Sequence, residues 1–556
     1  MDDFQSRVDS IRRTRSELEN HVIDEFLARH ISRRELLRAG SVLGMSLPLL
    51  SFIAACGSST PTGGTSAGVK KGGKIAIAQV TPGHAIDPLK VGDQGGLSLL
   101  GQMGEFLSFA SNDLKLEPRL AESWSSNSDG SIWTFKIRQG VKFNDGSPMT
   151  AEDVAFSINL HADPANGSNA LSAFVGVIGK GAAKATDATT VQVGLEAPYG
   201  NFPYLVSSNN YNLIILPKTY TGGFEKSFVG TGPWKVTGYQ TGASMSTVRN
   251  PNYWDKSNIP PLDEVEWKFF QDEPPRVLAL QGNTVQFLAG FTPANGQALF
   301  SDSNISVIGV QSTNHRQVHM RTDMEPLADK RVRQAIALAL NRPEIVQGLL
   351  NGKAQVANDS PFFKLYPSSD TSVPQRTRDM NKAKQLLAAA GKAAGFPVTF
   401  TTWRNNEMPD YAQLIQSAVK PLGINITLNI TDSATYYGDA VFGKSPWLDS
   451  VMGMTEYGHR GVPNVFLGAP LTSTGSWNSA HFKNPQYDGL FKQYAAALDV
   501  ASQKKIAGQI ERLLLDETPI IFGYTYDSLG ASRSNLANVG LTGLGQVDLR
   551  TAGYKS

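Results

Sequence analysis

The sequence predicts a mixed α/β protein that folds as two or three domains. Its 556 residues are too many to pack around one hydrophobic core. The 53 glycines and 30 prolines indicate many loops and argue against a helical bundle. Segments with the two-residue period of strands fill the middle of the chain, and helix–strand units follow from about Arg316.

The chain before about Arg316 is predicted to contain mixed helix and strand units, with a middle region that is mainly strands. Trp133, Phe135 and Ile137 alternate with polar residues, which is typical of a strand with one buried face. Thr150 precedes a helical pattern and has Asp153 three residues on, so the two predict a capping box. Further strands are predicted at residues 74–78, 190–195, 234–239, 244–249 and 265–270.

The second half predicts helices packed on a sheet. Residues 316–322 have the pattern of a strand, and a helix with Val332, Ile336 and Leu340 on one face follows them. Pro343 suits the first turn of a second helix. Two more helices are predicted at 381–390 and 411–422, each ended by a glycine, then a strand at 424–430, a helix at 503–516 and a strand at 519–524.

The chain's single cysteine, Cys56, lies between an apolar stretch rich in small residues and a flexible Gly/Ser/Thr segment. A lone cysteine is often a small buried hydrophobe, but these flanks favour an export signal with a cleavage site. The run Ile53-Ala54-Ala55-Cys56 also resembles the bacterial lipobox. That resemblance implies that Cys56 is acylated and becomes the mature N-terminus.

The residues before this stretch resemble a twin-arginine export motif, with Arg33 and Arg34 as the paired arginines. The alternative is an uncleaved membrane helix, but residues 39–55 are marginal in length and contain Pro48. We therefore expect residues 1–55 to be a twin-arginine lipoprotein signal and residues 56–71 a flexible tether.

Composition and motif content exclude several function classes. Lys and Arg total 51 against 49 Asp and Glu, without a basic run, so nucleic acid is not an expected partner. The chain has no HExxH motif, which argues against the common zinc metalloproteases. His315 and His319 have the spacing of a helical metal pair, but their segment reads as a strand. We expect no metal, no cofactor and no catalytic residue.

A series of short motifs, in order along most of the mature chain, resembles the family 5 extracellular solute-binding proteins. This is the peptide- and nickel-binding type that serves ABC importers. The motifs are LAESW at 120–124, WTF at 133–135, DGSPMTAEDV at 145–154, GTGPW at 230–234, NYW at 252–254, DKRVRQAI at 329–336, and Trp477-Asn478 with Tyr487-Asp488.

The resemblance implies the class II periplasmic-binding-protein fold, a clamshell of two lobes with an extra inserted domain. Carried over, lobe I comprises 72–107, 217–315 and 519–556, the extra domain 108–216, and lobe II 316–518. A solute is captured as the lobes close, and the closed form is read by the permease of an importer with its ATPase. We expect a monomer held by its lipid at the extracytoplasmic face of the cell membrane.

A peptide is the commonest cargo of this family, and many members hold its ammonium with a Trp-x-x-Asp motif. The corresponding run here is residues 453–460, where Met replaces the tryptophan and Glu456 supplies the acid. The aromatic residues expected in the cleft are Trp403, Tyr436 or Tyr437, and Tyr457. A surface ion pair with Arg460 is the alternative role of Glu456.

Other readings of the same chain remain open at this point. The same fold also binds non-peptide solutes, namely oligosaccharides, opines and metal complexes. A secreted hydrolase is the second function class, and a lipid-anchored sensory or adhesion protein with the same fold is the third.

Overall fold

The computed structural model describes residues 68–556. Cys56, Arg33 and Arg34 lie outside the described residues, so the export signal and the lipid anchor stay predictions. Within residues 68–556, none of the helices combines the length and the apolar character needed to cross a bilayer.

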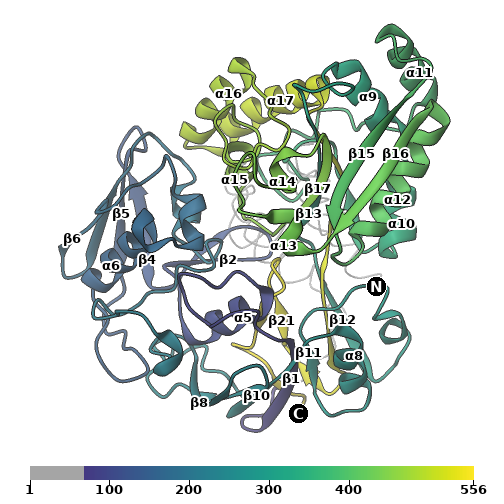
Figure 1. Cartoon of the computed structure of the whole chain (residues 1–556). Coiled ribbons are helices and arrows are strands. Elements are labelled where there is room, and N and C mark those ends of the chain that lie inside the picture. Colours follow the sequence, from purple (N-terminus) through teal and green to yellow (C-terminus); the bar gives the residue numbers. More distant parts are fainter. Residues whose placement is uncertain (1–67) are drawn as a thin grey trace, which may run out of the picture. The chain divides into compact units, whose positions relative to one another are not determined.

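The first body, which we call lobe I, is built on a seven-stranded sheet (Figure 1). Strand β1 pairs in parallel with β10 on one side and β11 on the other, and Ile75 and Ile77 of β1 are fully buried. In sheet order the strands are β12 (Ile305–Val310), β19 (Ser528–Arg533), β11 (Phe287–Leu288), β1 (Lys74–Val80), β10 (Glu264–Phe270), β9 (Ser244–Arg249) and β8 (Trp234–Gln240). Its helices are α5 (Gln94–Met103) and α8 (Glu273–Gln281). Short ladders near the C-terminus pair β20 (Leu536–Ala537) with β23 (Gly553–Tyr554) and β21 (Gly540–Leu541) with β22 (Val547–Asp548).

A second body, the inserted domain, lies in the chain between α5 and β8. The predicted strand has Trp133, Phe135 and Ile137 buried on one face, and the predicted capping box joins Thr150 to Asp153. Its four-stranded antiparallel sheet has the order β4 (Ala121–Ser126), β5 (Ile132–Ile137), β7 (Thr190–Gly194) and β6 (Ala183–Asp187). With it are α6 (Ala151–Ala162), α7 (Phe202–Leu205) and the hairpin of β2 (Ser108–Ala110) and β3 (Leu116–Pro118).

The third body, lobe II, is a six-stranded mixed sheet with helices on both faces (Figure 1). In sheet order its strands are β14 (Ala354–Val356), β18 (Ile520–Tyr526), β13 (His315–Met320), β17 (Met452–Tyr457), β15 (Phe396–Trp403) and β16 (Ile424–Thr431). One face carries α9 (Lys330–Ala339), α10 (Arg342–Leu350), α11 (Met380–Ala389) and α12 (Met408–Val419). The other carries α15 (Asn464–Gly468), α16 (Pro485–Ala496) and α17 (Val500–Glu517), and the short helices α13 (Ser433–Tyr437) and α14 (Pro446–Asp449) follow β16.

The predicted boundary between lobe II and the C-terminal part of lobe I, at 518/519, does not match the strand pairing. Strand β18 pairs with β13 and β14 of lobe II, and only the next strand, β19, pairs with lobe I. The strand was correctly predicted, but its apolar residues suit either sheet. Ile520, Ile521 and Phe522 are fully buried in the cores of lobe II.

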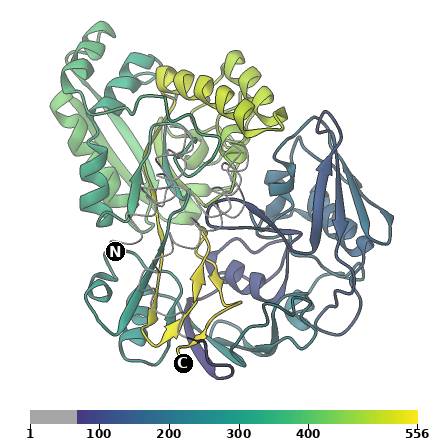
Figure 2. The ribbon, with the colours of Figure 1, turned by 180° about the vertical axis from the view of Figure 1, so that it is seen from behind.

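The chain therefore passes between the two large sheets through residues 311–314 and again through Asp527. Figure 2 shows the second passage from behind, where the C-terminal strands, in yellow, run from lobe II into the sheet that contains β1. The two passages are hydrogen-bonded to each other. The Tyr526 N–H donates to the Asn314 carbonyl at 3.0 Å, and the Ser312 hydroxyl donates to the Tyr526 carbonyl at 2.8 Å. We call residues 311–314, together with Tyr526 and Asp527, the hinge.

The segment that begins at His459, just after β17, is held against the hinge. The Thr313 N–H donates to His459 Nδ1 at 3.1 Å, and the His459 N–H donates to Asn314 Oδ1 at 2.7 Å. Burial, with a smaller contribution from the charge of Arg460, lowers the pKa of His459 to about 3. The imidazole is therefore neutral near pH 7, as its role as an acceptor requires.

This burial makes the stability of the protein depend on pH. A histidine in the unfolded chain titrates near 6.5, well above His459 in the folded state. The unfolded chain therefore takes up a proton first, and His459 favours folding fully only above about pH 6.5. As the pH falls from there toward 3, this residue reduces the free energy of unfolding by about 1.4 kcal/mol per pH unit.

We predict that His459→Asn, which keeps an acceptor near the Nδ1 position, loses less stability than the wild type between pH 6.5 and 4.5. Urea denaturation at several pH values measures the two slopes. His84→Asn is the control, because the ring of His84 is exposed. Equal slopes for His459→Asn and the wild type would contradict the prediction.

Candidate functional site

A cavity of about 580 Å³, which we call the interlobe cleft, is lined by residues of both lobes. Lobe I contributes Gln94, Arg276 and the loop after β11, and lobe II contributes residues of β13, β17 and the segment before α12. The volume lies within the roughly 300–1,000 Å³ that is usual for small-molecule sites. Because both lobes line the cleft, an occupant would touch both of them.

Glu456, on β17, lines this cleft with a carboxylate held by two donors. The indole N–H of Trp403 donates to Oε2 at 2.9 Å, and the phenol of Tyr437 donates to Oε1 at 2.8 Å. The two aromatic rings also contact each other, with centroids 5.9 Å apart in an edge-to-face arrangement. Three of the residues predicted from the sequence therefore form one cluster.

The local fold explains how these side chains meet. Trp403 is the last residue of β15 and Tyr437 the last residue of α13, so both stand where the chain leaves an element. Asp432 is the N-cap residue of helix α13, and its side chain accepts a hydrogen bond from the Thr435 N–H. Burial, reinforced by the charge of Glu456, raises the pKa of Tyr437, so the phenol keeps the proton that it donates.

The two other predicted aromatic residues lie differently. Tyr436 is fully buried, and its hydroxyl donates to the Met454 carbonyl at 2.8 Å. Tyr457 lines the cleft but is only 8 % exposed, and its ring stacks on Trp477 at 5.7 Å. Of the neighbouring tyrosines that the sequence could not separate, Tyr437 is therefore the one that reaches Glu456.

Arg460 does not form the ion pair that was the alternative role of Glu456. Its guanidinium donates to the Asn209 carbonyl at 3.0 Å and lies 4.6 Å from the centroid of the Tyr211 ring, so it joins lobe II to the inserted domain. Among residues 68–556, Glu456 has no ion-pair partner. The cleft thus contains a carboxylate that is oriented by neutral donors but not neutralised.

Beside Glu456 lies a buried ion pair that the sequence analysis did not single out. Arg316 is directly opposite Glu456 in the β13–β17 ladder, but its guanidinium binds Glu407 with both Nε, at 2.8 Å, and Nη2, at 3.0 Å. Burial opposes both charges, but their attraction lowers the pKa of Glu407 and raises that of Arg316. A charged residue in an otherwise buried strand was the available signal, because such a residue needs a partner.

The cleft also contains a positive group, Lys353, whose Nζ lies 5.6 Å from the centroid of the Phe300 ring. No ion pair joins Lys353 to a carboxylate in the described part of the chain. Nor does that part contain a group of three or more His, Cys, Asp or Glu side chains that could hold a metal ion. His315 and His319 lie on β13, as the sequence predicted, and their rings donate to separate partners, the Thr313 and Ser450 carbonyls.

Known proteins resemble this chain along most of its length. It is 28% identical to the dipeptide-binding protein DppE of Bacillus subtilis (strain 168), over 82% of this chain and 87% of that protein. It is 25% identical to the glutathione-binding protein GsiB of Escherichia coli (strain K12), over 80% and 88% of the two chains. The structure of the periplasmic binding protein DppA of Helicobacter pylori, in complex with peptide STSA, superposes with a TM-score of 0.73 at 22% identity, covering 88% of this chain and 99% of that one.

The superposition identifies the mixed α/β fold as that of class II periplasmic binding proteins. The model of the bacterial extracellular solute-binding proteins, family 5, matches residues 115–456. Its members are non-enzymatic binding proteins of ABC transporters. This chain belongs to family 5 of the bacterial extracellular solute-binding proteins.

Proposed function

We propose that this protein captures a peptide with a free amino terminus in the interlobe cleft and delivers it to the permease of an ABC importer, whose ATPase subunits drive uptake. The observation that carries the proposal is the carboxylate of Glu456. It lies in the cleft, is oriented by Trp403 and Tyr437, and has no cationic partner in the described chain. A ligand ammonium would supply that partner.

Two further features suit a peptide with a free ammonium. Trp403 and Tyr437 orient the Glu456 carboxylate from outside the lining of the cavity, so neither ring fills the space beside it. Lys353, on the same cleft, is available for the carboxylate of a peptide. The relatives DppE and GsiB are named for dipeptides and glutathione, which both carry a free ammonium and free carboxylates.

The proposal includes the location of the protein. Cys56, once acylated, would hold the chain as a monomer at the extracytoplasmic face of the cell membrane, after export directed by Arg33 and Arg34. The segment after Cys56 is polar and rich in glycine, so only covalent acyl chains would keep it at a bilayer. Each buried CH₂ contributes about 0.8 kcal/mol to membrane binding.

We predict that Glu456→Gln weakens the binding of a free-amine peptide about ten- to a hundredfold. A charge-assisted hydrogen bond contributes about 1.5–3 kcal/mol, and the amide keeps the shape of the side chain without its charge. An N-acetylated peptide of the same sequence has no ammonium, so its affinity should barely change. Calorimetry with both ligands and both proteins completes the double-mutant cycle.

Asp410→Asn is the matched control, because Asp410 is an exposed acid on the same cleft. Asp410→Asn should change the affinity for either peptide little if the ammonium is held by direct contact with Glu456. A larger change would mean that the combined negative charge of the cleft attracts the ammonium. If Glu456→Gln lost the same affinity for both peptides, the proposed contact between Glu456 and the ligand ammonium would be refuted. If no peptide binds and the protein binds an opine, an oligosaccharide or a metal complex instead, the proposed peptide cargo is wrong.

We predict that Cys56→Ala is exported without acylation, whereas Arg33→Lys combined with Arg34→Lys blocks export. Mass spectrometry of the mature N-terminus and fractionation of the cells check both outcomes. A wild-type protein whose N-terminus is unacylated, or begins upstream of Cys56, would refute the anchor while leaving the cargo experiment unaffected.

A further inference from the structure

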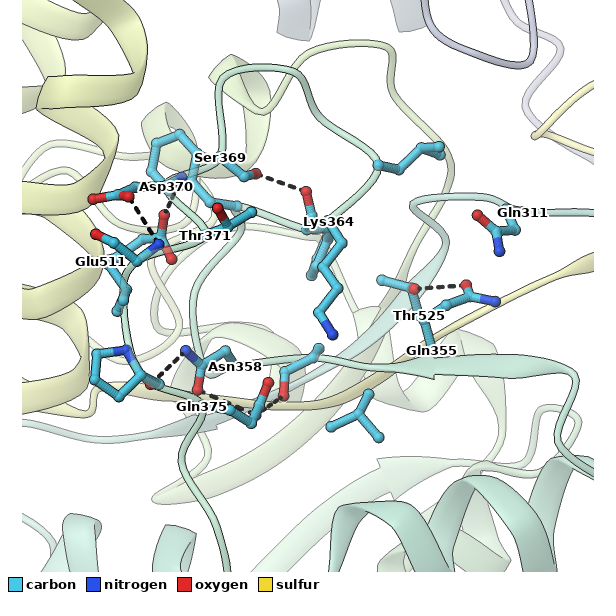
Figure 3. Close-up of a pocket in the computed structure, with 18 of the residues that line it drawn as sticks. Gln311, Gln355, Asn358, Lys364, Ser369, Asp370, Thr371, Gln375, Glu511 and Thr525 are labelled. Carbon is cyan, nitrogen blue, oxygen red and sulfur yellow. Dashed lines mark hydrogen bonds between the residues drawn. The ribbon is translucent and has the colours of Figure 1, made fainter. Parts of the chain in front are cut away.

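A second cavity, of about 490 Å³, lies beside the hinge and shares no lining residue with the interlobe cleft (Figure 3). We call it the side cavity. Gln311 and Ser312 of the first hinge segment line it, as does Thr525 near the end of β18. The rest of its wall comes from β14, from the loop between β14 and α11, from α17 and from Asp113 of the β2–β3 hairpin. Its volume also falls within the usual range of small-molecule sites.

Lys364 is the positive group of the side cavity. Figure 3 shows its side chain extending from the loop into the middle of the cavity, between the Asn358–Gln375 side and the Gln355–Thr525 side. None of the described residues forms an ion pair or a hydrogen bond with its ammonium group. An exposed ammonium without a carboxylate partner, surrounded by amide side chains, is a suitable contact for an anion.

Two acidic groups of the cavity, Asp370 and Glu511, lie together at another part of its wall (Figure 3), and the third, Asp113, is paired with Lys115. Glu511 is only 3% exposed, and its one hydrogen bond in the described chain comes from the Asp370 N–H at 3.2 Å. Arg512, its neighbour on α17, directs its guanidinium to the Gly508 carbonyl and to Asp370. Glu511 is therefore a buried carboxyl group at the wall of a cavity without a cation bound to it.

Apolar side chains complete the wall. Phe362 and Phe363 are each 5% exposed and Val373 is 7% exposed, and all three line the cavity. The side cavity therefore presents one free cation, one acidic pair and an apolar surface. These groups match the ammonium, the carboxylate and the side chain of an apolar amino acid.

We propose that the side cavity binds a free α-amino acid with an apolar side chain, its carboxylate at Lys364 and its ammonium at Asp370 and Glu511. The site is independent of the interlobe cleft and of the cargo proposed for it. Because hinge residues line the cavity, the bound amino acid would contact both lobe II and the segment that leads to lobe I.

Binding should also move a proton. Burial, assisted by the nearby charge of Asp370 and opposed by that of Arg512, raises the pKa of Glu511 to about 8, so the carboxyl group is mainly protonated at pH 7. A ligand ammonium favours the carboxylate form and lowers this pKa. The proton of Glu511 then passes to the buffer, and up to one proton is released for each ligand bound.

The test is calorimetry of L-leucine with the mature protein at pH 7 in two buffers of different ionisation enthalpy. We expect leucine to bind and to release protons, and N-acetyl-leucine and leucinamide, each lacking one of the two charges, to bind at least tenfold more weakly. Lys364→Gln should weaken leucine at least tenfold, and the exposed position of Lys364 makes this variant safe for folding. Glu511→Gln should abolish the proton release.

Two controls separate the side cavity from the cleft. Glu456→Gln should leave the affinity for leucine unchanged, and Lys364→Gln should leave the affinity for a cleft peptide unchanged. The proposal is overturned if leucine gives no binding heat at millimolar concentration. It is also overturned if Lys364→Gln binds leucine with the affinity of the wild type. Loss of leucine binding in Glu456→Gln would overturn it too, because leucine would then occupy the interlobe cleft.

Discussion

The hydrogen-bonded pairing of the two hinge segments is the constraint on which the rest of the structure depends. The Tyr526 N–H and the Asn314 carbonyl join the segments, and no third covalent passage connects the two large sheets within the described chain. A rotation of the lobes must therefore be absorbed by a few dihedral angles in these segments. Both cavities lie at this joint, since Asn314 lines the interlobe cleft and Ser312, two residues earlier, lines the side cavity.

The interlobe cleft contains two neighbouring glutamates, Glu407 and Glu456, of which only Glu407 has a cationic partner among residues 68–556. Glu407 is almost fully neutralised by the two-point contact with Arg316, and the Tyr524 hydroxyl donates a third hydrogen bond to it at 2.8 Å. Glu456, one strand away from Arg316, receives only the neutral donors Trp403 and Tyr437. The first arrangement stabilises the wall, because breaking a buried pair leaves a costly unpaired charge. The second arrangement leaves a charge available to a ligand.

Much of the local structure could be predicted from the sequence because it depends on neighbouring residues. The capping box at Thr150 and Asp153 is present, and Gly423 ends the 3-10 turn at 420–422 that follows α12, in the left-handed conformation with φ at 76°. The assignment of β18 to a sheet could not be predicted, because alternation identifies a strand and not its partner. Arg316 and Glu407 are 91 residues apart, and only the fold brings them together.

The site shows the same division. Glu456 and Trp403 could both be found because the family resemblance marks their positions. The choice between Tyr436 and Tyr437 depends on how the short helix α13 is turned against β17, since the two hydroxyls bind Met454 and Glu456 respectively. The side cavity could not be predicted at all, because Lys364 and Glu511 come from a loop and a helix that are far apart in the sequence.

The order of strands in lobe I has a consequence for how the polypeptide reaches this state as it is synthesised. All six strands of the lobe II sheet come from one uninterrupted stretch that ends at Tyr526, so that sheet can form from its own residues. The lobe I sheet begins with β1, yet β19 must insert between β12 and β11 to complete it. Such distant pairings form slowly, since a long loop must close before any contact stabilises it. The lobe whose first strand is made earliest is thus the last to be finished, and until β19 arrives the unpaired edges of β11 and β12 are open to wrong partners.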